Sequence, residues 1–181
     1  MKKTFRKIHM YLSLFFLPLA IMYAVTGIIY ISGSNQDVGA TINKYVIIDK
    51  ITAGQEKEAV YNYLKTNNIK LPNDKTSKSK KGNLVFGGAA YSAELEIKKT
   101  GEQTLTVKNR SFIGNLIMLH KSKGMWYFDV LSIAFGIALF ILYFSGLMMT
   151  LFGSKNGRMP QYATIAAGFI ITIILGYLSL Q

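Results

Sequence analysis

Three long apolar segments dominate the pattern of hydrophobic and polar positions along the chain. They cover residues 8–31, 125–152 and 161–180, and Asp129 is the only charged residue in any of them. At 1.5 Å per residue the first segment reaches about 36 Å as a helix, which exceeds the ~30 Å hydrocarbon core of a bilayer. A cleaved signal peptide has an apolar core of only about 7–15 residues. We therefore interpret residues 8–31 as an uncleaved signal anchor and predict three transmembrane helices.

Residues 32–124 have a different pattern, typical of a small folded domain. Apolar positions at helical spacing predict a helix over 54–65, and Ala93, Leu95 and Ile97 alternate with charged residues as in a half-buried strand. Further elements are expected as strands over 45–49, 83–87 and 104–108, a charged solvated loop over 75–81, and an apolar helix over 112–120. The order strand, helix, meander predicts a membrane α-helical protein with a small α+β domain between its first two spans.

Basic residues in the short flanks predict the orientation of the spans. Four lie in the tail, residues 1–7, and two lie in the hairpin that joins the second and third spans, residues 153–160. Short basic flanks stay in the cytoplasm, so we expect a cytoplasmic N-terminus, an extracytoplasmic domain and an extracytoplasmic C-terminus. Most of the net charge of +12 then lies outside, which argues against nucleic acid as a partner.

The composition excludes several kinds of site. The chain has no cysteine and only two histidines, His9 and His120. Disulfides, thiolate zinc sites, iron–sulfur clusters and cysteine nucleophiles are therefore excluded, as is a site with three imidazole ligands from one chain. Asp129, beside Trp126 and Tyr127, is interpreted either as an interfacial acid or as a partner of Lys121 or Lys123.

Three short motifs in a fixed order resemble those of a known family. They are Lys7-Ile8-His9-Met10-Tyr11-Leu12-Ser13-Leu14, Ala24-Val25-Thr26-Gly27, and Leu119-His120-Lys121-Ser122-Lys123-Gly124 followed by a span with Phe144-Ser145-Gly146-Leu147. Over residues 1–152 the chain resembles the PepSY-associated transmembrane helix proteins, with residues 32–124 similar to a PepSY domain. The resemblance implies the inner (cytoplasmic) membrane of a bacterium. Some larger members, with duplicated units and more spans, look like ferric-siderophore reductases that hold b-type haem through intramembrane histidines.

This resemblance suggests haem b as the cofactor of His9 and His120. The two side chains are expected at opposite faces of the membrane, about 30 Å apart, so one chain cannot ligate a single haem with both. A homodimer, or a pair with a homologous membrane partner, could provide two histidines at each depth. Gly27 is expected near the depth of His120 and Gly146 near that of His9, where a missing side chain would leave space for the macrocycle.

Other interpretations remain open for the same residues. Each histidine could face lipid headgroups, and the glycines could serve helix packing alone. Met10 or Met118 could supply a Met/His pair, and Met118, His120 and Met125 could hold copper. The functional hypothesis is electron transfer across the membrane, with ferric-chelate reductase activity and an anionic ferric chelate as possible activity and partner. The alternative is a non-catalytic, membrane-anchored binding or regulatory module, or an accessory subunit of a larger complex.

Overall fold

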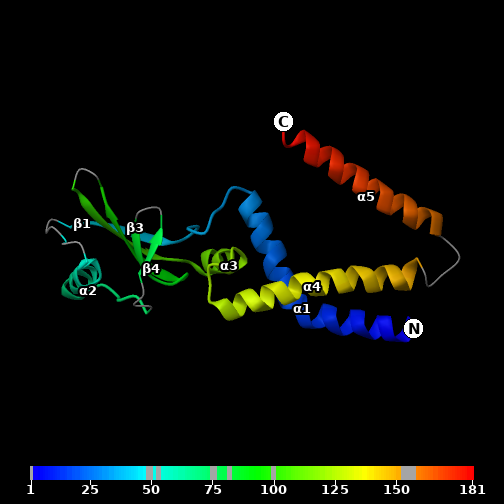
Figure 1. Ribbon diagram of the computed structural model, residues 1–181, viewed down its shortest axis with the longest axis horizontal. Helices are drawn as coiled ribbons and strands as arrows, with labels where there is room; N and C mark the ends of the chain where they lie inside the picture. The colour runs from blue at the N-terminus through cyan, green and yellow to red at the C-terminus, as the bar shows by residue number, and fades with distance from the viewer. Residues whose placement is uncertain are drawn as a thin grey trace. The chain divides into compact units, whose positions relative to one another are not determined.

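The computed structural model describes residues 2–47, 51, 54–73, 77–80, 83–98, 101–151 and 158–181. Figure 1 shows its elements, which are α1 (Lys2–Ile31), β1 (Thr41–Ile47), α2 (Glu56–Thr66), β2 (Ser77–Lys80), β3 (Asn83–Gly87), β4 (Tyr91–Ile97), β5 (Gln103–Asn109), α3 (Phe112–His120), α4 (Trp126–Thr150) and α5 (Arg158–Leu178). The chain divides into two compact units. We call Met1–Leu19 with Leu131–Gln181 the helical unit, and Ala20–Val130 the sheet unit.

Among the described residues, three helices are long and apolar enough to cross a membrane, namely α1, α4 and α5. These are the helices that the apolar segments predict. Helix α1 begins earlier than expected, at Lys2, because lysine and arginine are good helix formers and prolong the apolar helix. Helix α5 has Pro160 in its first turn, where a missing backbone N–H leaves no helical hydrogen bond unmade. Most of the predicted hairpin over 153–160 lies outside the described residues.

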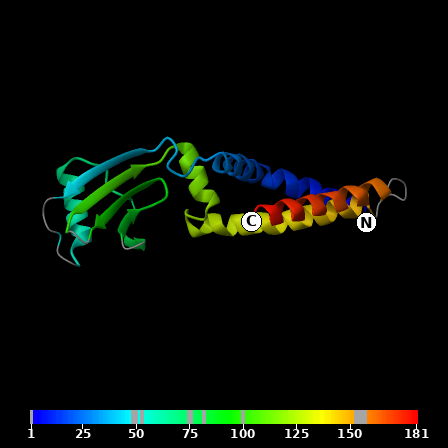
Figure 2. The ribbon, with the colours of Figure 1, turned by 90° about the horizontal axis from the view of Figure 1, so that it is seen from above.

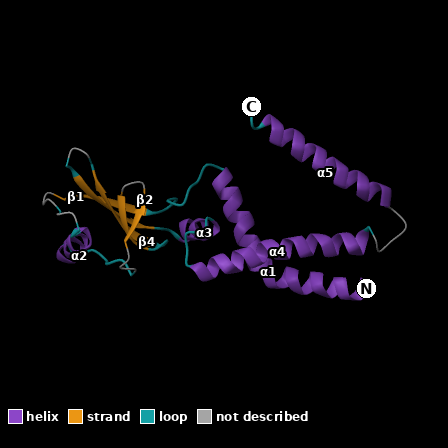
Figure 3. Ribbon diagram, viewed as in Figure 1, coloured by secondary structure: helices purple, strands orange, loops and turns teal. Residues whose placement is uncertain are grey.

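The five strands of the sheet unit form one sheet in the order β1-β5-β4-β3-β2 (Figures 2 and 3). All neighbouring strands are antiparallel, so β3, β4 and β5 form the predicted meander, while β2 adds to one side of it and β1 to the other. Leu105 of β5 pairs with Tyr45 of β1 and with Leu95 of β4. Because paired residues point to the same side of a sheet, this register places their side chains on one face.

Helix α2 covers that face and forms the core with it. Val60 and Leu64 are fully buried against a cluster that includes Phe86, Leu95 and Leu105. Burying each such side chain contributes about 1.5–3 kcal/mol before the cost of ordering the chain. The opposite face carries polar positions such as Glu94, Thr106 and Lys108, which are only partly buried. The period of two in β4 and β5 therefore produces a sheet with one apolar and one polar face.

The predicted solvated loop over 75–81 is wrong in part, because Ser77–Lys80 forms strand β2. This strand pairs with β3 from Ser77 opposite Phe86 to Lys80 opposite Asn83. Backbone hydrogen bonds across a hairpin do not depend on the hydrophobicity of the side chains. Lysines are common on edge strands, where they oppose pairing with other chains. A polar, lysine-rich sequence is therefore compatible with this position in the sheet.

Candidate functional site

In the sheet unit, His120 contacts a hydroxyl, a glycine and an aromatic ring of α1. His120 is the last residue of α3, and its Nδ1 lies 2.6 Å from Oγ1 of Thr26. A methyl group added at Gly27 would lie 3.9 Å from Cε1 of the same imidazole. The ring of Tyr23, one turn before Thr26, packs on the imidazole with a centroid separation of 4.4 Å. The side chain of His120 is thus held from three positions on one face of α1.

In the helical unit, His9 has a matching environment. Its Nδ1 lies 3.0 Å from Oγ of Ser145 in α4, and a methyl group added at Gly146 would lie 4.0 Å from its Cε1. Two ring pairs hold α1 against α4 in this unit, Phe5 with Phe144 and Phe16 with Phe135. Each unit therefore contains one histidine opposite a hydroxyl residue that is followed directly by glycine.

The hydrogen bonds of the two hydroxyls determine which imidazole nitrogen carries the proton. Thr26 is 1% exposed and donates to the carbonyl of Met22 at 2.6 Å. Ser145 is fully buried and donates to the carbonyl of Leu142 at 3.0 Å. A hydroxyl has one proton, so when that proton is donated to the carbonyl, the oxygen accepts a hydrogen bond from the facing Nδ1–H. A neutral imidazole with its proton on Nδ1 has its lone pair on Nε2, the form in which Nε2 can bind a metal.

The glycines of the two motifs lie beside different histidines. The structure brings Gly27 to His120 and Gly146 to His9. Each methyl group added at these glycines would make ordinary van der Waals contact with the imidazole edge. Within the described residues, no group of three or more histidine, cysteine, aspartate or glutamate side chains could hold a metal ion. Each unit can therefore provide one imidazole ligand, not a complete ligand set.

Sequence reasoning missed the hydroxyls of Thr26 and Ser145 and the ring of Tyr23. The signal was present, because a hydroxyl residue directly precedes the glycine in both motifs.

Asp129 pairs with neither Lys121 nor Lys123 among the described contacts. Its Oδ1 is buried without a hydrogen-bond partner, while Lys121 donates to Gln36 at 3.0 Å.

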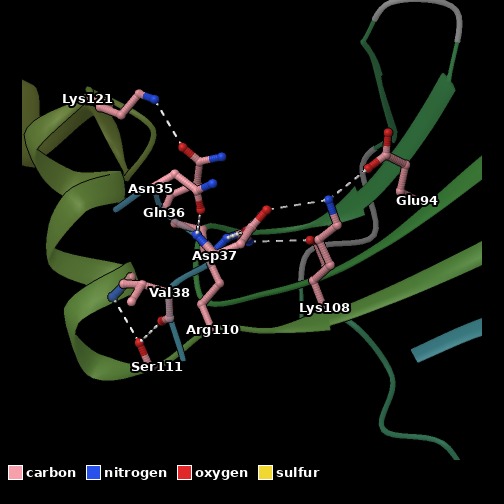
Figure 4. A network of polar contacts seen from close by, with 12 residues as sticks. Asn35, Gln36, Asp37, Val38, Glu94, Lys108, Arg110, Ser111 and Lys121 are labelled. Carbon is pink, nitrogen blue, oxygen red and sulfur yellow. Dashed lines mark hydrogen bonds and ion pairs between the residues drawn. The ribbon is translucent and has the colours of Figure 1, made fainter. Parts of the chain in front are cut away.

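A polar network positions α3, and with it His120, in the sheet unit (Figure 4). Arg110, at the end of β5, donates to Asp37 in the loop after α1 at 3.1 Å and to the carbonyl of Ala89 at 2.7 Å. Lys108 lies 3.9 Å from the same aspartate and 3.5 Å from Glu94. These contacts connect the loop that follows α1 to three parts of the meander.

Ser111 and Gly114 join the same loop to the first turn of α3. The hydroxyl of Ser111 donates to the carbonyl of Val38 at 2.6 Å and accepts from the backbone N–H of Gly114 at 3.1 Å, which caps the helix. A methyl group at Gly114 would lie 2.6 Å from the carbonyl oxygen of Gln36. Only glycine therefore allows this approach without a shift of the backbone.

Comparison with known proteins gives one match. The family model described as PepSY_TM-like matches residues 2–181. No curated protein and no solved structure matches the chain. The match includes α5, so the likeness seen in the motifs of residues 1–152 extends over the third apolar helix.

Proposed function

Because the chain belongs to the PepSY_TM-like family, we propose that it is an integral membrane electron-transfer protein that holds b-type haem through His9 and His120. The family and the three apolar helices make it a multi-pass membrane protein of PepSY type. One observation carries the finer proposal. In both units a buried hydroxyl followed by glycine lies within hydrogen-bond distance of Nδ1 of a histidine, an arrangement in which Nε2 would be the ligand nitrogen.

His120 in the sheet unit and His9 in the helical unit would each hold a haem through one imidazole. The hydroxyls of Thr26 and Ser145 fix the orientation and tautomer of the imidazoles, as partners of metal-binding histidines do. Gly27 and Gly146 add no bulk beside the rings. The second ligand at each position must come from another chain, which we propose is a second copy or a homologous membrane protein. Bound haem would supply one-electron transfer at a potential that its axial ligands set.

The distribution of charge supports electron transfer from the cytoplasm to the outside. Basic flanks argue for a cytoplasmic N-terminus in the inner membrane of a bacterium. Residues 32–124, with 15 basic and 8 acidic side chains, would then face outward and carry more than half of the net charge of +12. A basic surface raises the local concentration of anionic ligands. The proposed electron acceptor is therefore an anionic ferric chelate.

The test is the visible spectrum of the full chain purified from cells supplied with haem. We expect a reduced-minus-oxidised haem spectrum that His9→Ala and His120→Ala each diminish, because each removes one ligand set. Phe140→Ala, on the exposed surface of α4, is the matched control and should keep the spectrum. A folded protein that contains no porphyrin under these conditions would contradict the proposal.

A second candidate is a non-catalytic PepSY module that its helices anchor in the membrane, or an accessory subunit of a larger complex. It is favoured by the fact that each imidazole already satisfies a buried hydroxyl of another helix, and so can stabilise helix packing without a cofactor. Gly27→Ala and Gly146→Ala separate the candidates. Both methyl groups fit against the imidazoles, so folding should persist in either case. Haem content should fall only if the glycines provide space for the macrocycle.

A further inference from the structure

The sheet unit exposes large apolar side chains at the start of α3 and at the start of the membrane-spanning helix α4. Phe112 and Ile113 in the first turn of α3 are 76% and 42% exposed, and Trp126 and Tyr127 at the start of α4 are 72% and 61% exposed. Helix α3 buries only Gly114 and Ile117. The exposed apolar surface of α3 is therefore its first turn, since the residues after Ile113 are buried or partly buried.

Basic residues lie at the other end of α3. Lys121 follows the helix directly, and its Nζ lies 4.9 Å from the centre of the Tyr30 ring at the end of α1. Lys123 is also exposed. A short helix with apolar residues on one side and lysines at its end is typical of segments that lie in a membrane surface. Trp and Tyr next to a span mark the depth of the lipid headgroups.

We propose that α3 lies in the headgroup–acyl boundary of the leaflet next to the sheet unit. Phe112 and Ile113 contact the lipid chains there, and Lys121 and Lys123 face the headgroup phosphates. The occupant of the apolar surface is the bilayer itself, because α4 enters the membrane at Trp126 and only one turn separates it from α3. At about 14 Å, α3 is too short to span the bilayer. The placement holds His120, the last residue of α3, at the depth of the boundary, and it does not depend on bound haem.

The experiment uses lipid quenching of a single tryptophan in the full chain. Trp126 is the only tryptophan, so Trp126→Phe provides a silent background. Phe112→Trp in that background reports on α3, and Lys57→Trp on the exposed surface of α2 is the matched control. Each protein is placed in nanodiscs of phosphatidylglycerol and phosphatidylcholine, with brominated or unbrominated acyl chains. The ratio of tryptophan emission in brominated lipid to that in unbrominated lipid cancels quenching by any bound pigment, because the pigment quenches equally in both.

We expect the tryptophan at position 112 to lose most of its emission in brominated lipid and to resist aqueous iodide. The tryptophan at position 57 should show the reverse. Iodide quenching at position 112 without lipid quenching would overturn the proposal, and so would protection from both quenchers, which would indicate a protein partner or a second copy. If Phe112→Trp fails to fold, a nitroxide on Ile113→Cys, in a chain otherwise free of cysteine, measures the same depth by its accessibility to oxygen and to a water-soluble relaxant.

Discussion

The contact between an imidazole and a buried hydroxyl sets the properties of both histidines. Thr26 and Ser145 are almost completely removed from solvent, and each hydroxyl also bonds to a backbone carbonyl of its own helix. Loss of a hydroxyl would therefore leave Nδ1 of its histidine without this partner. A buried polar group without a partner costs more free energy than the hydrogen bond itself contributes. Each histidine therefore depends on its hydroxyl, whether or not a cofactor binds.

Thr26→Val tests this dependence. It keeps the shape of the side chain but leaves Nδ1–H of His120 without its acceptor, so we expect a loss of about 1–3 kcal/mol in the free energy of unfolding. Thermal unfolding in detergent measures the change. Thr150→Val is the control, because Thr150 is exposed and donates only to backbone carbonyls. Equal stability of the two variants would contradict the role assigned to the Thr26 hydroxyl.

Tyr91 gives the sheet unit a dependence on alkaline pH. Burial raises the pKa of its phenol above the ordinary value of 10.0, and Tyr45 acts in the same direction. The hydroxyl donates to the carbonyl of Lys70. Above about pH 10 the unfolded chain loses this proton before the folded chain does, so the stability from Tyr91 is present below pH 10 and declines as pH rises further.

Tyr91→Phe checks this linkage. Below pH 10 the wild type should be the more stable protein, because the variant lacks the hydrogen bond to Lys70. The difference in the free energy of unfolding in favour of the wild type should shrink as pH rises beyond 10. Denaturant unfolding of both proteins, with pH 7 as the reference, gives the comparison. If the difference in free energy of unfolding stays constant or grows above pH 10, the phenol of Tyr91 does not titrate as stated.

At the scale of elements, the joint between the loop after α1 and the first turn of α3 depends on close packing. Ser111 caps α3 and also holds the loop, and Gly114 lets the carbonyl of Gln36 approach the helix. The joint sets the direction of α3 and therefore the place of His120 opposite Thr26. Ser111 and Gly114, at the other end of α3 from His120, thus influence the geometry of its imidazole.

Gly114→Ala should disturb this joint. The added methyl would meet a backbone oxygen at 2.6 Å, and overpacking of this kind costs about 1–3 kcal/mol. Gly136→Ala in α4 is the matched control, since nothing lies within 4 Å of its added methyl and alanine favours a helix over glycine by about 1 kcal/mol. Opposite shifts in unfolding temperature are expected, and a stabilised Gly114→Ala would refute the close approach.

At the scale of the whole molecule, the proposed orientation predicts which parts are accessible from outside the cell. The chain has no cysteine, so single cysteines give unambiguous labelling with a membrane-impermeant maleimide. Lys57→Cys in α2 should react in intact spheroplasts, whereas Lys3→Cys near the N-terminus should react only after the membrane is opened. Labelling of both positions from the same side would refute the orientation, and with it outward electron transfer.

The strongest periodicities in the sequence were sufficient to predict most elements. Long uncharged runs predict α1, α4 and α5, because a bilayer requires that length and apolarity whatever the fold. The alternation in β4 and the helical spacing in α2 predict the meander and its covering helix. Strand β2 could not be found in this way, because Ser77–Lys80 has no apolar pattern and depends on backbone pairing with β3.

What the sequence by itself determined is the set of spans, the small α+β unit and the identity of the two histidines. It also indicated which glycine accompanies which histidine, because the depth of a residue follows from its position along a helix. Only the tertiary structure decided that the hydroxyls of Thr26 and Ser145 lie within hydrogen-bond distance of the imidazoles of His120 and His9. A hydrogen bond depends on the rotation and approach of two helices within a few tenths of an ångström, and hydrophobic periodicity does not specify those quantities.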